Sequence, residues 1–193
     1  MADTIAMDSD ASLSNHFLIA MPKLADPYFF HTVTYLATHD DSGARGLVIN
    51  RPSEMTLADL FKHLDITSTR QDILEQPVYT GGPVQVEQGF ILHNPDKDWQ
   101  GTLSTQCSLS LTASKDILEA IAIGEGPKEF LVALGYAGWG AGQLEQEMLE
   151  NSWLTGPADD NIIFHTPIDE RWNRAAQLVG IDLSLLSTDM GHA

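Results

Sequence analysis

Hydrophobic and polar positions alternate along the chain in short blocks that predict both strands and helices. The apolar runs at 17–21, 46–49 and 130–134 have the length of buried strands. Residues 32–38 are rich in β-branched and aromatic side chains, and turn-forming residues at 40–43 separate them from the second run, which predicts a β-hairpin. Further strands are predicted at 78–80, 89–92 and 108–111.

Helical periodicity is clearest where Leu57, Leu60, Phe61 and Leu64 fall on one face, which predicts a helix over 56–64. Thr56 followed by Asp59 resembles a capping box at its start. Other helices are predicted at 114–123, 143–150 and 167–179, and directly after Asp26 and Pro27.

Hairpin signals mixed with strand-to-helix connections favour an α/β or α+β fold, with largely antiparallel β-sheets flanked by helices. A chain of 193 residues can bury one good core, and no interdomain linker or internal repeat is visible. We therefore expect a flexible acidic tail at 1–14 and a single compact domain at 15–193.

The charge of the chain narrows the class of partner. Asp and Glu number 27 against 10 Lys and Arg, which gives a net charge of −17, and the basic residues are scattered singly. This balance disfavours direct nucleic-acid binding, because a phosphate backbone would be repelled. No apolar run approaches the roughly 18 residues needed to span a bilayer, so no membrane segment is predicted.

Cysteine usage points to a reducing compartment. Cys107 is the single cysteine, so no intrachain disulfide can form, and a cytoplasmic location is expected. Nothing adjacent marks Cys107 as an activated thiolate, which favours a small buried hydrophobe over a reactive group.

The most distinctive segment surrounds Trp139 with glycines between Gly135 and Gly142, at a predicted strand-to-helix junction. Such a bend could bring a ligand close to backbone N–H groups, or it could be a purely structural turn. The spacing matches neither GxxxxGK[ST] nor GxGxxG, so no cofactor is predicted.

Two further bends are candidates for the same site. Gly81, Gly82 and Pro83 form a tight turn, and Arg51 emerges between Asn50 and Pro52 at the end of an apolar run. Its guanidinium could hold a carboxylate or phosphate, or it could pair with a surface acid.

Catalytic chemistry has weaker support. The seven histidines lack the spacing of metal ligands, so no metal site is predicted. His93 and His39 each end a strand, where a histidine can face a cleft or simply be hydrogen bonded at the surface. No GxSxG motif is present.

Several segments resemble the bacterial YqgE/AlgH family in the identity of their residues and in their order along the chain, over about residues 16–193. The matching segments are 17–22 (FLIAMP), 46–52 (GLVINRP), 81–84 (GGPV), 89–93 (GFILH), 134–139 (LGYAGW), 142–145 (GQLE), 153–154 (WL) and 191–193 (GHA).

The resemblance implies a compact bacterial cytoplasmic α/β domain with antiparallel sheets and no settled biochemical activity. One branch is named for alginate regulation, and the family is often described as transcriptional regulators. This chain departs from relatives at Gln88, Ala113 and Gly156, where Arg, Thr and Cys are found, so thiol chemistry through position 156 cannot operate here.

The leading hypothesis is a non-catalytic ligand-binding or regulatory domain whose bends share one cleft, with a small molecule or protein as the unidentified partner. One alternative is a transcriptional regulator that contacts DNA or a protein, and another is a hydrolase or transferase using His93 and Glu145. Oligomeric state is not specified by the sequence. The predicted cleft residues are Asn50, Arg51, Pro52, Gly81, Gly82, Pro83, His93, Gly135, Trp139, Gln143 and Glu145.

Overall fold

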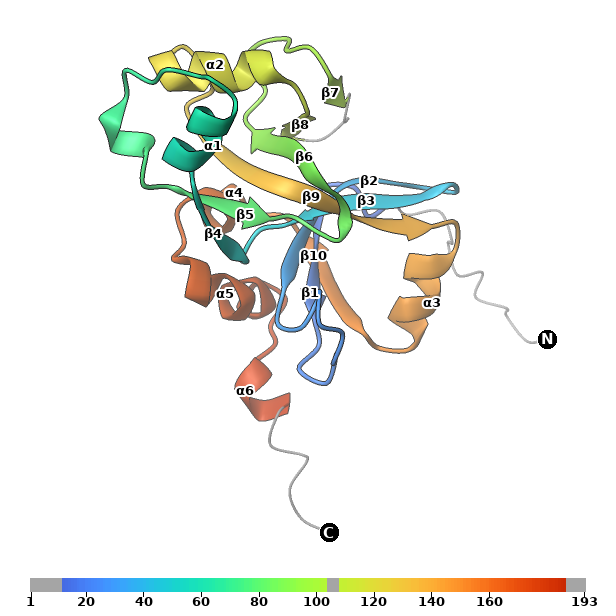
Figure 1. The fold of residues 1–193 in the computed structure, drawn as a ribbon. Coiled ribbons are helices and arrows are strands. Elements are labelled where there is room, and N and C mark those ends of the chain that lie inside the picture. The colour runs from blue at the N-terminus through green and yellow to red at the C-terminus, as the bar shows by residue number, and fades with distance from the viewer. Residues whose placement is uncertain (1–11, 104–107, 187–193) are drawn as a thin grey trace, which may run out of the picture.

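A curled, ten-stranded sheet runs through the middle of the protein (Figure 1). The computed structural model describes residues 12–103 and 108–186. The strands are β1 (His16–Ala20), β2 (Val33–Asp40), β3 (Gly43–Val48), β4 (Pro52–Thr56), β5 (Pro77–Thr80), β6 (Val84–His93), β7 (Thr102–Leu103), β8 (Ser110–Thr112), β9 (Phe130–Gly140) and β10 (Trp153–Pro157).

Strand pairing is almost entirely antiparallel, as predicted. The main order is β10-β1-β2-β3-β9-β6-β8-β7, with β4 paired to β5 beside it. Among the pairings of the described strands, β5 with β9 is the parallel one. Together with the helices this gives a single α+β domain, which confirms the predicted fold class.

The long strand β9 joins the two halves of the sheet. Its first half pairs with β6 and β5, while its last residues pair with β3. The sequence predicted that strand structure would end at 134 and that a loop would cover 135–142. That prediction was wrong, because the strand continues to Gly140 and absorbs the bend at Gly135, whose φ is +73°.

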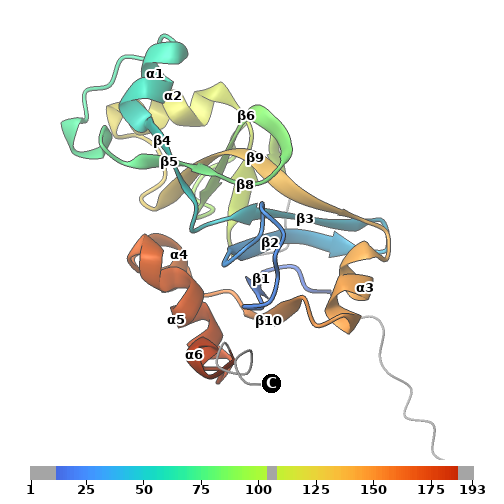
Figure 2. The same cartoon turned by 60° about the horizontal axis from the view of Figure 1, so that its bottom comes forward.

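Three groups of helices surround the sheet (Figures 1 and 2). One group packs on the half that contains β5 and β6, another lies against β9 and β10, and the third covers the end formed by β1 and β2. In the same order they are α1 (Leu57–His63) with α2 (Lys115–Ile123); α3 (Gln143–Leu149); and α4 (Asp160–Phe164), α5 (Arg171–Leu178) and α6 (Leu183–Leu186). Short 3-10 turns cover Gln71–Ile73 and Ile168–Glu170.

Local sequence signals had mixed success. The capping box is present, since the Thr56 hydroxyl accepts from the Asp59 amide and the Asp59 carboxylate accepts from the Thr56 amide. The helix predicted after Asp26 and Pro27 is wrong. That segment is a turn, in which the Tyr28 amide donates to Asp26 Oδ1 at 2.8 Å.

Most of the predicted tail at 1–14 lies outside the described residues. Residues 1–11 lie outside the described part of the chain, as do Cys107 and the terminal 191–193 segment. Residues 12–14, however, are packed against β2, because the Leu13 amide donates to His39 Nδ1 at 2.9 Å and Ser14 Oγ accepts from the His39 amide at 2.9 Å.

Candidate functional site

The three predicted bends do approach one another along their backbones. The Thr80 amide donates to the Arg51 carbonyl at 2.8 Å, and Pro52 pairs with Tyr79. The Gly81 amide donates to the Leu134 carbonyl at 2.8 Å, directly before Gly135. These three segments therefore meet through their backbones. The side chains of Arg51 and Trp139 contact different parts of the protein.

The glycines of these bends pack against each other. A Cβ on Gly82, whose φ is +156°, would lie 2.1 Å from the Tyr136 carbonyl carbon, and one on Gly135 would lie 2.4 Å from the Gly82 oxygen. Backbone therefore fills the space between them. Their role in this fold is the close crossing of two chain segments, with Pro83 half-buried just beyond it.

Asn50 and Arg51 hold neighbouring loops. Asn50 Nδ2 donates to the His31 carbonyl at 2.9 Å, and Asn50 Oδ1 accepts from the Val33 amide at 2.9 Å. The Arg51 guanidinium donates to three carbonyl oxygens of the turn that replaces the predicted helix, those of Pro27, Tyr28 and Phe30. These hydrogen bonds take three of the five N–H groups of the Arg51 guanidinium and tie it to the backbone of this turn.

Trp139 belongs to a separate cluster under α3. Its indole Nε1 and that of Trp153 both donate to Glu147 Oε2, at 3.0 and 2.9 Å, and Gln143 Nε2 donates to the other oxygen of Glu147 at 3.0 Å. Phe29 packs against both indoles, with ring centroids 5.7 and 5.5 Å away. Trp139 and Gln143, which were expected to line a cleft, thus help to hold α3 against the sheet.

His93 and Glu145 lie at opposite ends of β9. His93 pairs with Phe130 at the first residue of the strand, whereas Glu145 follows its last residue, roughly 30 Å further along. His93 is fully buried between Thr112 Oγ1 and the Asn94 carbonyl, and burial lowers its pKa. Glu145 contacts His39, and a hydrogen bond from its own backbone amide, followed by that of His39, lowers its pKa.

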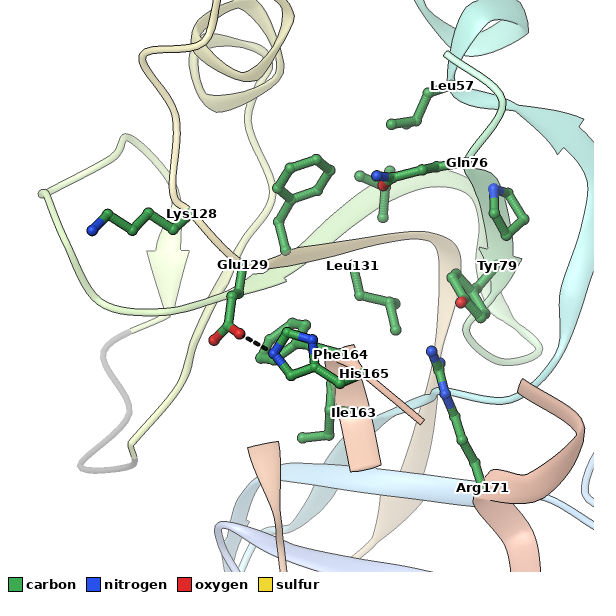
Figure 3. Close-up of a pocket in the computed structure, with 13 residues that line it drawn as sticks. Leu57, Gln76, Tyr79, Lys128, Glu129, Leu131, Ile163, Phe164, His165 and Arg171 are labelled. Carbon is green, nitrogen blue, oxygen red and sulfur yellow. Dashed lines mark hydrogen bonds and ion pairs between the residues drawn. The ribbon is translucent and has the colours of Figure 1, made fainter. Parts of the chain in front are cut away.

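A different part of the protein contains a half-enclosed cavity of about 240 Å³ (Figure 3). It lies where β5 and the start of β9 face α4 and the beginning of α5. Aliphatic and aromatic side chains line it together with polar groups, in about equal measure. The lining residues are Leu57, Gln76, Pro77, Tyr79, Lys128, Glu129, Phe130, Leu131, Val132, Ile163, Phe164, His165 and Arg171.

Arg171 places a guanidinium at the inner end of this cavity, beside Tyr79 (Figure 3). The residue is only 5% exposed. Nε donates to the Thr166 carbonyl at 3.0 Å and Nη1 donates to the Ile49 carbonyl, while Cζ lies 5.4 Å from the Tyr79 ring centroid. Within the described residues, no carboxylate forms an ion pair with Arg171 and no acceptor contacts Nη2. Nη2 is not among the fully buried unpaired atoms of these residues, so it borders the open space of the cavity.

The mouth of the cavity carries both signs of charge. Glu129 pairs with His165, as the dashed line in Figure 3 marks, and the exposed Lys128 stands on the same side. Burial, then the negative charges of Glu129 and Asp159, raise the pKa of nearby Asp160. The cavity thus combines a buried cation inside with a partly acidic entrance.

The sequence analysis counted Arg171 only among the scattered basic residues. The available signal was helical spacing, since Arg171 lies four residues before Ala175, which is buried. A cation on the inward face of a helix is unusual enough to mark a site.

Two further structural observations concern residues 12–103 and 108–186. No group of three or more His, Cys, Asp or Glu side chains in these ranges is arranged to hold a metal ion. None of their helices has both the length and the apolar character needed to cross a bilayer.

Comparison with known proteins places the chain in a family. The sequence pattern described as AlgH-like matches residues 17–184. A UPF0301 protein of Thioalkalivibrio sulfidiphilus is 53% identical over 97% of this chain and 100% of its own length, and one of Methylococcus capsulatus is 52% identical over 96% and 100%.

Solved structures agree with this placement. The solution structure of the AlgH protein from Pseudomonas aeruginosa has a TM-score of 0.77 and 48% identity, covering 96% of this chain and 98% of that one. A Corynebacterium diphtheriae protein with 18% identity and a TM-score of 0.72, covering 95% of each chain, shares the fold. This chain therefore belongs to the AlgH-like family, as the order of its sequence motifs predicted.

Proposed function

We propose that this protein is a cytosolic, non-catalytic domain that binds a small molecule in the cavity lined by Tyr79, Leu131 and Arg171. The observation that carries the proposal is the largely buried guanidinium without a carboxylate partner in a cavity lined by both apolar and polar groups. Apolar side chains combined with a few convergent polar groups are typical of ligand pockets.

Energetics support a ligand at this position. Removing a charge from water costs several kcal/mol in the folded state unless a partner compensates. Two carbonyl oxygens and the Tyr79 ring solvate Arg171 in part, but Nη2 is left without a protein acceptor among the described residues. Because Nη2 borders the open cavity, water can solvate it in the free protein. A bound molecule with an anionic acceptor would replace that water with a charge-assisted hydrogen bond.

The composition of the lining favours binding over catalysis. It contains no Ser, Thr or Cys that an adjacent base could activate as a nucleophile. The separation of His93 from Glu145 along β9 gives the hydrolase or transferase alternative no shared site.

A role in transcription through a protein partner is compatible with ligand binding, and the cavity would then be its sensor. Direct contact with DNA has less support, because the chain carries a net charge of −17. An electrophoretic shift assay over a salt series distinguishes the two, since salt-sensitive retardation of DNA would contradict the charge argument.

The proposal is tested by thermal-shift screening of the full chain against a broad set of charged and neutral small molecules. A ligand that binds the native state raises the melting temperature, and the rise grows with the logarithm of its concentration once that exceeds its dissociation constant. Gln76→Trp is the matching variant, because Gln76 is exposed at the mouth and a larger side chain there would obstruct entry. Gln71→Trp is its control, because Gln71 is equally exposed but does not line the cavity.

We expect hits that stabilise the wild type and Gln71→Trp but not Gln76→Trp, and that mass spectrometry recovers unchanged. Absence of any stabilising compound, or equal stabilisation of both Trp variants, would overturn the cavity as the binding site. Conversion of a bound compound into a product would contradict the proposal that the domain is non-catalytic, but not the proposal that the cavity binds a ligand.

A further inference from the structure

We infer that the ligand of this cavity is a small monocarboxylate with a compact apolar body, its carboxylate bound to Arg171 and its body packed between Leu131 and Phe164. The inference rests on the proposed function and adds the chemical class of the ligand. Its basis is the combination of unused donors, cavity size and entrance charge.

The unused donors of Arg171 suit a planar anion. A guanidinium carries five N–H groups. The described residues accept from Nε and from Nη1 once each, which leaves three N–H groups on Nη1 and Nη2. Because Tyr79 covers a face of the guanidinium, an incoming group approaches along its edge, where a carboxylate can accept two parallel hydrogen bonds.

The size of the cavity limits the body of the ligand. A volume of about 240 Å³ lies below the roughly 300–1,000 Å³ of pockets that take drug-sized ligands. It corresponds to on the order of eight water-sized volumes, since each water occupies about 30 Å³ in the liquid. The cavity therefore cannot enclose a nucleotide, whereas it can hold an acid the size of benzoate.

The entrance disfavours a second negative charge. Glu129 stands at the mouth, and burial, with smaller contributions from the negative charges of Glu129 and Asp159, raises the pKa of nearby Asp160. Lys128 is exposed there and its charge is screened by solvent. A phosphate dianion or a dicarboxylate would bring a second negative charge into a cavity that Glu129 also lines.

The test uses pairs of probes that differ only in charge. Acetate, butyrate, benzoate and phenylacetate are titrated into the full chain beside acetamide, butyramide, benzamide and phenylacetamide. Phenylphosphonate and benzene-1,4-dicarboxylate are the dianionic probes. Binding is followed by calorimetry and by amide NMR shifts of the residues lining the cavity.

We expect at least one of the four carboxylates to bind roughly 10- to 100-fold more tightly than its amide, as is typical of hydrogen bonds to a charged group. Arg171→Met should abolish this difference. Arg174→Met is the matched control on the same helix, because Arg174 is exposed and paired with Glu170, and it should leave the difference intact.

Other outcomes separate this inference from the proposed function. Amides that bind as tightly as their acids would overturn the carboxylate class while leaving the cavity a binding site. Tighter binding of phenylphosphonate or of benzene-1,4-dicarboxylate than of the monocarboxylates would contradict the inference that the ligand carries a single negative charge. If Arg171→Met does not fold, two measurements on the wild type decide: the ratio of the dissociation constants of each amide and its acid, and the location of the NMR shifts. Shifts at residues away from the cavity would contradict the inference.

Discussion

Two regions of this protein contain the groups from which ligand sites are usually built, and they use them in opposite ways. At the crossing of Gly81–Gly82 with Gly135, backbone meets backbone and Arg51 is bound to carbonyl oxygens nearby. At the cavity under α5, Arg171 retains donors that face open space. A distinctive motif therefore marked a structural junction, whereas an inconspicuous arginine marks the candidate site.

The difference shows that residue type and local sequence do not decide whether a polar group is available. Availability depends on which acceptors the fold brings within hydrogen-bond distance, and buried groups without one are costly. The following predictions test this contrast, beginning with the largest effect.

Gly135→Ala should destabilise the fold by about 3 kcal/mol or more, because a positive φ and a backbone clash act together. Gly142→Ala is the matched control, since Gly142 has nearly the same φ of +75° but open space around the added Cβ. It should cost only about 1 kcal/mol. Urea denaturation measures both, and equal losses would contradict the close-crossing role of Gly135.

Glu147→Leu should cost about 2 kcal/mol, because it leaves the indole N–H groups of Trp139 and Trp153 without their acceptor. Glu150→Leu, on the exposed surface of the same region, should change stability by less than about 0.5 kcal/mol. Chemical denaturation together with near-ultraviolet circular dichroism of the tryptophans checks this. An unchanged spectrum in Glu147→Leu would show that the cluster does not brace α3.

The two arginines should respond differently when each is replaced by Met. Arg51→Met removes hydrogen bonds to three carbonyl oxygens and should destabilise the protein by about 1 kcal/mol. Arg171→Met removes two hydrogen bonds but also an unpaired buried charge, so we expect a smaller change, within about 1 kcal/mol of zero, without ligand. A loss of several kcal/mol for Arg171→Met would make that residue a structural element.

The smallest effect concerns pH. Because the pKa of Glu145 is lowered in the folded state, its stabilisation is complete above the unfolded pKa and disappears as pH falls through the folded value. The side chain is 53% exposed, so solvent screening limits the effect to about 0.3 kcal/mol. Glu145→Gln should reduce the stability difference between pH 7 and pH 3 by that amount. An unchanged difference would show that neither the hydrogen bond from its own amide nor the contact with His39 stabilises the Glu145 carboxylate measurably.

The sequence predicted the fold more fully than the site. Periodicity located the capped helix after Thr56 and the hairpin of β2 and β3, because local side-chain spacing determines those elements. It predicted a loop after 134, because a cluster of glycines usually indicates conformational freedom. In the structure Gly135 is needed because the backbone of Gly82 passes close to it. The turn after Asp26 was misjudged for a similar reason, since Arg51, distant in sequence, holds its carbonyl oxygens.

The candidate site depended even more on tertiary structure. Arg171 comes to the cavity only because α5 packs beside Ile49 and Tyr79, more than ninety residues earlier in the chain. No local pattern encodes which of its donors find acceptors. The resemblance to the AlgH-like family supplied the fold but no site, because it implied no settled activity.

The most direct test of the central claim is ¹⁵N NMR of the arginine side chains during titration with benzoate and the other carboxylate probes. If the donors of Arg171 are unfilled, its Nη resonances should shift and its guanidinium rotation should slow on binding, while those of Arg51 stay unchanged. Saturating binding that leaves the Arg171 resonances unmoved, or that moves those of Arg51 instead, would contradict the account.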